Sequence, residues 1–365
     1  MNWYNIYNIE NIDSPALVLY KERIRQNINL AVEMVKDVSK LRPHVKTNKI
    51  PEVCAMMMEA GIGKFKCATI AEAEMLAMIK AKDVLLAYQP VGPKIKRLLR
   101  LIQQYRKTEF SCLVDNFSTA KSLSEVFAES GTVLEVFIDL NIGMNRTGIQ
   151  PKHALDLFKQ LQQIEGILVK GLHAYDGQIR DRDIVQRQEK SDIGFKSVTD
   201  LATQIESITK QPLTIVAGGT PTFPTHIKRK VECSPGTFVF CDWGYKHQLP
   251  DEPFGFAALV ITRVISIVDD KTITTDLGHK SVAAENPLPR VHFLNAPDVI
   301  PVEQSEEHLV LKVTDSSTYK IGDVLYGVPV HICPTVALYE KAHVIENNEA
   351  TTTWNVIGRD RAITI

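Results

Sequence analysis

The segment Pro43-His44-Val45-Lys46-Thr47-Asn48-Lys49 places two lysines three residues apart, after a short apolar run and before a helical pattern. A lysine amine that has lost its proton can bond to an aldehyde as a Schiff base. A second cation nearby lowers the pKa of an amine, so Lys49 would favour the reactive form of Lys46. The alternative is a pair of solvated surface lysines, which is what most lysines are. The rest of the chain has to decide between these interpretations.

The composition indicates a cytoplasmic protein without a nucleic-acid or membrane partner. The 365 residues include 42 Lys and Arg against 43 Asp and Glu, and this balance argues against a nucleic-acid partner. No apolar run approaches the roughly 20 residues that cross a membrane. The N-terminus has neither the basic nor the apolar region of a signal peptide. Six scattered cysteines without a CxxC pair predict free thiols in a reducing compartment.

Short β-rich runs alternate with longer helical patterns from about residue 40 to residue 245. The helical patterns include 69–80, 151–164 and 185–208. The predicted strands are 41–45, 65–69, 84–88, 110–114, 133–139, 168–173, 213–217 and 237–241. Eight strands with helices between them predict an α/β protein built on a closed (β/α)8 TIM barrel.

The predicted secondary structure changes after Asp242, where strand patterns follow one another without long helices. These strands are expected at 257–268, 271–276, 309–313, 324–330 and 352–357, and they predict a second, mostly β domain. An extra βα unit at 16–38 belongs either with the barrel or with this domain. We expect the barrel to span 15–243, and the β domain to combine 1–14 with 244–365.

Barrel enzymes carry their chemistry on the loops after the carboxyl ends of the strands. Here those loops are polar or glycine-rich. The loops after strands one, five, six and seven carry Lys46, Arg146, Tyr175 and Gly218-Gly219-Thr220. Ser234-Pro235-Gly236-Thr237 leads into the predicted eighth strand, so it would have to fold back to reach the same end.

Two of these turns suit a phosphate, because glycine lets backbone N–H groups approach an anion and threonine adds a hydroxyl donor. They contain Gly219 with Thr220 and Gly236 with Thr237. The alternative is that the glycines only make tight turns. A lysine across the rim from a phosphate site suggests pyridoxal 5'-phosphate, with Lys46 at the aldehyde.

Two further rim residues could contact the cofactor ring. Arg146 carries a permanent charge that could hold the phenolate oxygen of the cofactor, or it could be a surface residue after a turn. Tyr175 could stack or hydrogen-bond at the ring, or it could be a plain rim aromatic.

His331-Ile332-Cys333 is the compact metal-ligand candidate of the C-terminal region. On a strand, residues i and i+2 point to the same face, so an imidazole and a thiolate would form half of a zinc site. A partly buried histidine beside a core cysteine is the alternative.

The chain resembles the fold-type III pyridoxal-phosphate enzymes, whose barrel is of the alanine-racemase type, and within them the D-threonine aldolase and D-serine dehydratase group. The similarity runs over nearly the whole chain. The motifs that carry it are Asp13-Ser14-Pro15-Ala16, Arg42-Pro43-His44-Val45-Lys46-Thr47, Gly143-Met144-Asn145-Arg146-Thr147-Gly148, Ala174-Tyr175-Asp176-Gly177, Gly218-Gly219-Thr220-Pro221, Pro235-Gly236-Thr237, Asp276-Leu277-Gly278-His279-Lys280 and Pro329-Val330-His331-Ile332-Cys333-Pro334-Thr335-Val336.

The resemblance assigns roles to these residues. It implies Lys46 as the Schiff-base lysine and catalytic residue, Arg146 on the O3' side of the cofactor, and Tyr175 at the pyridine ring. It gives the phosphate to Gly219, Thr220, Gly236 and Thr237. It gives a divalent metal near the substrate's β-hydroxyl to His331 and Cys333. It further implies a small D-amino acid as substrate and a homodimer, with no nucleic-acid or membrane partner.

Two departures from the family pattern matter. Gln178 stands where the family often has histidine after Tyr-x-Gly, and an amide cannot relay a proton. Cys333 stands where D-threonine aldolases are expected to have aspartate. Its soft thiolate is the dehydratase-like ligand and favours zinc over manganese or magnesium.

The resemblance leaves the reaction open. We expect a D-threonine aldolase-like lyase that converts D-threonine to glycine and acetaldehyde. The alternative is a D-serine dehydratase that forms pyruvate and ammonia, and after it an amino-acid racemase whose second base would be Tyr245 or Tyr326. A cofactor-carrier protein without catalysis is the rival outside enzymes, but it would not need the C-terminal β domain.

Overall fold

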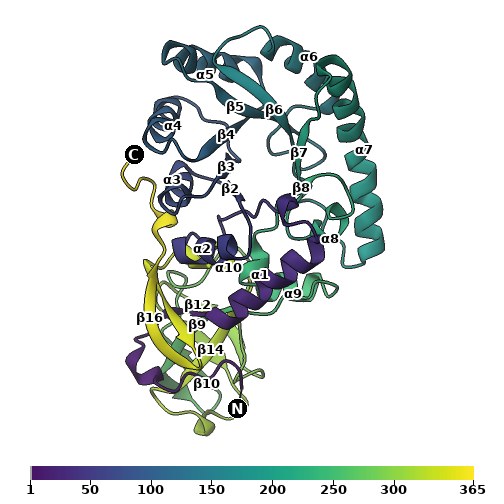
Figure 1. The fold of residues 1–365 in the computed structure, drawn as a ribbon. Coiled ribbons are helices and arrows are strands. Elements are labelled where there is room, and N and C mark those ends of the chain that lie inside the picture. Colours follow the sequence, from purple (N-terminus) through teal and green to yellow (C-terminus); the bar gives the residue numbers. More distant parts are fainter. Residues whose placement is uncertain (1) are drawn as a thin grey trace. The chain divides into compact units, whose positions relative to one another are not determined.

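The computed structural model describes residues 2–365, which divide into two compact units (Figure 1). Unit 1 contains the chain up to Leu30, together with Thr47–Val53 and Thr237–Arg359. Unit 2 contains Ala31–Lys46, Cys54–Gly236 and Asp360–Ile365. The chain therefore passes between units directly after Lys46 and directly after Gly236. The domain boundaries expected from the sequence, at residues 15 and 243, remain a prediction.

Unit 2 is built on a curled sheet of seven parallel strands in sequential order. Six of the eight predicted barrel strands correspond to regular strands of this sheet, with ends that shift by a few residues. The strands are β2 (Lys64–Cys67), β3 (Asp83–Leu86), β4 (Glu109–Val114), β5 (Leu134–Leu140), β6 (Ile167–Ala174), β7 (Thr214–Ala217) and β8 (Glu232–Cys233).

The first and last predicted strands are the two that differ. Residues 41–45 make only isolated parallel bridges, Leu41 with Cys233 of β8 and His44 with Lys66 of β2. Pro43 lies between these bridges and has no N–H group for a ladder, so no regular strand forms. Residues 237–241 are also no strand, because Thr237–Val239 form a 3-10 helix. The eighth strand is the earlier pair Glu232–Cys233, and segment 41–45 bridges it to β2.

Helices connect the strands of unit 2 and lie on the outer face of the sheet (Figure 1). Their ends follow local chemistry: the Thr69 hydroxyl caps α3 by accepting from the Glu72 amide, and Pro151 begins α6. The helices are α2 (Pro51–Glu59), α3 (Ile70–Met78), α4 (Pro93–Gln104), α5 (Phe117–Glu129), α6 (Pro151–Leu161), α7 (Ile184–Thr209) and α8 (Phe223–His226). Helix α1 (Lys21–Val35) precedes them.

The fully buried Arg42 crosslinks the strands at the closure of the sheet. Its Nη1 and Nη2 donate to Asp83 of β3 at 2.7 and 2.9 Å, and its Nε donates to Glu232 of β8 at 2.6 Å. The guanidinium lies among two carboxylates that are each only 9% exposed. Burial opposes its charge, but the hydrogen bonds to Asp83 and Glu232 outweigh burial and raise the pKa of Arg42.

We expect Arg42→Met to lower the free energy of unfolding by about 3 kcal/mol, because it leaves two buried carboxylates without their shared cation. Urea unfolding followed by circular dichroism measures this loss. Lys196→Met on α7 is the matched control, since its ion pair with Asp200 is exposed and contributes little. A loss for Arg42→Met no larger than for this control would contradict the role given to Arg42.

Unit 1 contains a nine-stranded sheet, mostly antiparallel. The strand order is β12-β13-β10-β9-β1-β15-β16, and β14 pairs with both β9 and β11. The strands are β1 (Ala16–Tyr20), β9 (Ala258–Asp269), β10 (Thr272–Thr275), β11 (Val291–Phe293), β12 (Ile300–Gln304), β13 (Leu309–Lys312), β14 (Val324–Pro329), β15 (Lys341–Glu346) and β16 (Glu349–Asn355). Two short helices complete the unit, α9 (Trp243–Gln248) and α10 (Ile332–Val336).

Strand β1 settles a question that its sequence leaves open. It pairs antiparallel with β9 and parallel with β15, so this N-terminal strand belongs to the β sheet of unit 1. All five of its residues are buried, in agreement with its continuous apolar run. The five strands predicted after residue 242 correspond to β9, β10, β13, β14 and β16, whereas β11, β12 and β15 had no sequence prediction.

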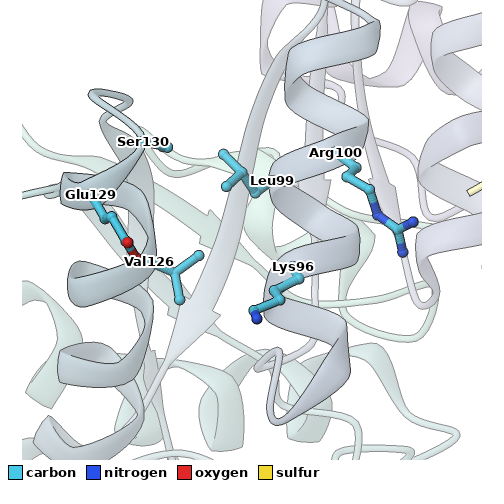
Figure 2. A pocket seen from close by; sticks show the side chains of 6 residues that line it. All are labelled: Lys96, Leu99, Arg100, Val126, Glu129 and Ser130. Atoms are coloured by element: carbon cyan, nitrogen blue, oxygen red, sulfur yellow. The ribbon is translucent and has the colours of Figure 1, made fainter.

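Two surface hollows lie on the helical layer of unit 2. One of about 510 Å³ separates α4 from α5 and is lined by Lys96, Leu99, Arg100, Val126, Glu129 and Ser130 (Figure 2). The other, of about 470 Å³, runs beside α7. Neither hollow contains a predicted site residue. Over residues 2–365, no helix is both long enough and apolar enough to cross a bilayer.

Candidate active site

The register of the parallel sheet fixes which residues share its carboxyl edge. Leu140 is paired with Ala174, Ala174 with Ala217, and Ala217 with Cys233. The residues that follow these four are therefore level with one another: Asn141, Tyr175, Gly218 and Ser234. This corrects the expectation that the segment Ser234–Gly236 would have to fold back. Because the eighth strand ends at Cys233, the segment leaves the same edge directly.

Lys46 follows the bridging segment at this edge. Its side chain is exposed, and its backbone N–H donates to Nδ1 of His44 at 3.3 Å. Lys49, the expected neighbouring cation, has a left-handed backbone with φ of 56°, and its Nζ donates to the Gly358 carbonyl at 3.2 Å. A lysine that does interact electrostatically with Lys46 is Lys66, on the adjacent strand β2. The sequence interpretation did not identify this residue.

Tyr175 lies against two glycines, and only glycine fits there. A Cβ added to Gly177 would lie 2.3 Å from the Tyr175 ring, and one added to Gly219 would lie 3.0 Å from it. The guanidinium carbon of Arg146 lies 5.1 Å from the ring centroid, within the range of a cation–π contact. The structure therefore brings together three predicted cofactor residues, Tyr175, Arg146 and Gly219.

The loop that carries Arg146 is fixed from below. The Thr147 hydroxyl donates to Oδ2 of Asp139 at 2.9 Å, and the Gly148 N–H donates to Asp115 at 3.1 Å. Gln178 closes the loop from the other side, because its Nε2 donates to the Ile142 carbonyl at 3.1 Å. An amide held in this way orients the loop, and it has no acid–base function.

The two predicted phosphate turns of unit 2 are joined. The Gly236 N–H donates to the Thr220 hydroxyl at 3.1 Å, and the Gly219 N–H faces the Thr222 hydroxyl at 3.4 Å. Gly219, Thr220 and Gly236 therefore lie in one small region at the carboxyl edge. Thr237 begins the 3-10 helix of unit 1, where its hydroxyl lies 3.5 Å from the sulfur of Cys333.

A buried charged cluster lies next to Tyr175. Nζ of Lys66 is 3.4 Å from Nε2 of His173 and 5.8 Å from the centroid of the Tyr175 ring. The other His173 nitrogen, Nδ1, bonds to Asp139 at 2.7 Å. Burial, followed by the positive charge of Lys46, lowers the pKa of Lys66 to about 7. Burial and then Lys66 lower the pKa of His173, so at neutral pH the imidazole is uncharged.

The lowered pKa of Lys66 makes stability depend on pH in a known direction. Between about pH 7 and the ordinary lysine value of 10.5, the unfolded chain holds a proton that the folded chain has released. Folding therefore becomes more favourable as pH rises through this window. The groups that face Lys66 are Lys46, Arg42, His173, Asp139 and Asp176, and the carboxylates only partly offset the burial.

In the cofactor-free protein, the test compares the free energy of unfolding of Lys66→Met with that of the wild type. We expect this difference to change by about 2 kcal/mol in favour of the wild type between pH 7 and pH 9. Methionine has no proton to lose, so only the wild type gains stability in this window. Urea unfolding at both pH values measures the difference. Lys82→Met removes an exposed lysine and should give the same difference from wild type at both pH values. If Lys66→Met behaves like Lys82→Met, then Lys66 is not the buried amine described here.

The candidate metal ligands lie in unit 1. His331 is the N-cap residue of α10 and Cys333 lies in its first turn, so the expectation that the pair shares a strand face is wrong. The two side chains are nevertheless within hydrogen-bonding distance of each other, and this contact contributes to the pKa of His331. Nδ1 of His331 bonds to Glu285 at 2.5 Å, which leaves Nε2 as the nitrogen that can bind a metal. The Thr47 hydroxyl lies 3.1 Å from the Cys333 sulfur.

Asp242 anchors this segment to α9. Its two carboxylate oxygens accept from the Ile332 N–H at 3.1 Å and from the Tyr245 N–H at 2.9 Å. Burial raises the pKa of Asp242 to about 6. Burial alone would lower the pKa of His331, but its bonds to Cys333 and Glu285 outweigh this and raise it to about 9. In residues 2–365, no group of three or more His, Cys, Asp or Glu side chains is arranged to hold a metal ion.

Two family descriptions match the chain. "Alanine racemase, N-terminal domain" matches residues 20–242, and "Putative serine dehydratase domain" matches residues 257–345. The first covers most of unit 2 and the second covers the larger part of unit 1.

Two curated relatives are similar over nearly their full length. The D-threonine aldolase of Arthrobacter sp is 25% identical over 362 residues, which cover 96% of this chain and 94% of that protein. The 3-hydroxy-D-aspartate aldolase of Paracoccus denitrificans strain Pd 1222 is 27% identical and covers 96% and 93%. The crystal structure of a D-threonine aldolase from Filomicrobium marinum matches with a TM-score of 0.89 at 25% identity, over 95% of each chain.

Proposed function

Because the chain belongs to the alanine racemase N-terminal domain family, as its motifs indicated, we propose that it is a D-threonine aldolase-like lyase that uses pyridoxal 5'-phosphate and a divalent metal. The relatives support a fold-type III lyase that acts on D-3-hydroxy amino acids. One observation carries the proposal: the carboxyl edge of the unit 2 sheet gathers Lys46, the Arg146–Tyr175 pair and the two joined glycine turns.

The residues of unit 2 fit the cofactor. The ring of Tyr175 lies against Gly219, and the two joined turns place glycines and the Thr220 hydroxyl beside one another, where a phosphate can approach. The N–H groups of Gly219 and Gly236 face threonine hydroxyls of the same region and fix the shape of the turns. Arg146 cannot lose its proton, so it can hold negative charge on the cofactor but cannot act as an acid. When bound, pyridoxal phosphate withdraws electrons from the bonds at the Cα of an amino acid.

Lys46 has two functions in this proposal. Its amine would hold the cofactor, and Nζ, when free of that bond, could accept or return a proton at the Cα of the substrate. Because the side chain is exposed and flexible, both positions are within the range of one lysine. Gln178 cannot share this work, since its amide is bound to the Ile142 carbonyl.

The residues of unit 1 fit a catalytic metal and not a structural one. Two protein ligands, His331 and Cys333, leave coordination positions for water and for substrate oxygen. A divalent metal lowers the pKa of a hydroxyl that it binds. Glu285 holds the His331 ring from its Nδ1 side, so Nε2 is the nitrogen that would bind a metal. Because the pKa of His331 is raised to about 9, the metal would have to displace the proton of this nitrogen. The thiolate favours zinc, with manganese or magnesium as harder alternatives.

The second candidate is a D-serine dehydratase. The match of residues 257–345 to the putative serine dehydratase domain favours it, and so does the Cys333 ligand. The racemase alternative loses one of its two candidates for the second base, because Tyr326 is 8% exposed and packs against Tyr4 at 5.3 Å between ring centroids. Tyr245 remains as the other candidate. We further propose a cytoplasmic homodimer, on the resemblance alone.

Product analysis separates the two lyase reactions. We expect purified protein with added pyridoxal phosphate and zinc to convert D-threonine to glycine and acetaldehyde in equal amounts. Formation of 2-oxobutanoate from D-threonine, or pyruvate from D-serine, identifies the dehydratase instead. Interconversion of D- and L-isomers without any of these products would overturn the lyase proposal.

A further inference from the structure

We infer that Asp176 is a positioning residue for the binding of the cofactor's phosphate. It orients the Thr222 hydroxyl, and this hydroxyl holds the turn that would bind the phosphate. The inference rests on the proposed function, because it assumes that the Gly218-Gly219-Thr220 turn holds this phosphate. Neither Asp176 nor Thr222 is among the residues to which the family resemblance assigns a role. Both are buried, with 2% and 1% of their surfaces exposed.

The hydrogen bonds run from Asp176 to the turn in two steps. The Thr222 hydroxyl donates to Oδ1 of Asp176 at 2.7 Å. Having given its proton to the carboxylate, the same oxygen can only accept, and the Gly219 N–H faces it at 3.4 Å. The Gly218 N–H donates to the Ala174 carbonyl at 3.0 Å, so the turn is also tied to the end of β6, two residues before Asp176.

The second carboxylate oxygen of Asp176 is held equally firmly. Its Oδ2 bonds to Nε2 of His226 at 2.8 Å and to the Ser191 hydroxyl at 3.3 Å. Arg229 can only donate, so its 2.8 Å bond to Nδ1 of His226 shows that this nitrogen accepts. His226 therefore donates from Nε2 to Asp176.

This arrangement keeps a buried carboxylate ionised. Burial would raise the pKa of Asp176, but the hydrogen bond from His226, the electrostatic attraction of His226 and then the hydrogen bond from Thr222 lower it below its ordinary value. Arg229 holds His226 from its Nδ1 side, and its other end bonds to Asp192. A permanently ionised Asp176 always accepts, and this fixes the direction in which the Thr222 hydroxyl points.

The packing beneath the turn leaves no room for a side chain at Gly218. Gly218 has a φ of 70°, and a Cβ added there would lie 2.5 Å from Cδ2 of His226 and 2.8 Å from the Thr222 oxygen. His226 and Thr222 thus form the floor on which the turn lies. Because Asp176 holds both side chains, loss of its carboxylate would release the turn from this floor while leaving Lys46 untouched.

The test compares pyridoxal phosphate with pyridoxal, which lacks the phosphate. We expect Thr222→Val, which keeps the shape but removes the hydroxyl, to raise the Kd of the cofactor-free enzyme for pyridoxal phosphate about tenfold. Its Kd for pyridoxal should stay within about twofold of the wild type. Thr222→Ser, the matched control, should bind both compounds like the wild type. Absorbance titration measures all of these values.

Asp176→Asn provides a second variant, with an expected larger loss for pyridoxal phosphate in the same selective pattern. An equal loss of affinity for both compounds in Thr222→Val, or no loss for either, overturns the inference. A failure of the proposed phosphate site looks different: the wild type itself would then bind pyridoxal as tightly as pyridoxal phosphate, and inorganic phosphate would not compete with the cofactor.

Discussion

Lys46→Ala should abolish the visible absorbance of the bound cofactor and lower lyase activity by at least about 10³-fold. The amine of Lys46 holds the cofactor's aldehyde carbon in this account, and an alanine can neither form that bond nor exchange a proton at Cα. The variant should fold normally, because the side chain that it removes is exposed. Absorbance spectra of the purified variant, together with activity on D-threonine, give the result.

Lys49→Ala is the matched control for this variant. Lys49 lies three residues on, and its Nζ is bound to the Gly358 carbonyl. We expect the spectrum of the bound cofactor to be retained. A variant pair in which Lys49→Ala loses the cofactor and Lys46→Ala keeps it would reverse the assignment.

Removal of the metal should have the second largest effect. We expect a chelator to lower lyase activity by at least about a hundredfold and to leave the visible absorbance of the cofactor unchanged, because His331 and Cys333 serve the substrate hydroxyl and not the cofactor. His331→Ala should reproduce the chelated state without a chelator. The control is His308→Ala, which removes an exposed histidine. Full activity in the chelated enzyme would refute the metal-dependent mechanism.

The identity of the metal provides a sharper version of the same prediction. Cys333→Asp replaces a soft thiolate with a hard carboxylate, so the variant should be reactivated better by manganese than by zinc. The wild type should show the opposite order. Reactivation of the chelated proteins by each metal in turn measures this preference.

The regular part of the barrel was predictable because its strands are compact apolar runs with helical patterns between them. The two errors have local causes. Residues 237–241 have a strand-like composition, yet β8 is the shorter pair Glu232–Cys233 that precedes Pro235. Residues 41–45 include Pro43, which interrupts the ladder and leaves only isolated bridges.

The rim motifs predicted which residues meet, but they could not predict what lies beneath them. The one sequence signal for a buried Lys66 is its position between the apolar residues Phe65 and Cys67. His173 bonds to Asp139, 34 residues away, and His226 bonds to Asp176, 50 residues away. Such separations along the chain form no recognisable ligand motif, so sequence spacing predicts no function for either histidine.

The candidate metal pair shows a different case, in which the two residues lie close together for another reason than the one expected, and their role as ligands stays a prediction. The run Val330-His331-Ile332-Cys333 has the composition of a strand, and strand geometry suggested a shared face. In the structure β14 ends at Pro329, and α10 begins directly after His331. The two side chains still meet, because the N-cap residue and the first helical turn are adjacent in space.

The attachment of the cofactor to Lys46 is the central claim, and borohydride reduction of the holoenzyme tests it most directly. Reduction makes the bond between lysine and cofactor permanent, so that peptide mass spectrometry can locate it. We predict a pyridoxyl group on Lys46 and on no other lysine. The same group found on Lys49 or on the buried Lys66 would contradict the account.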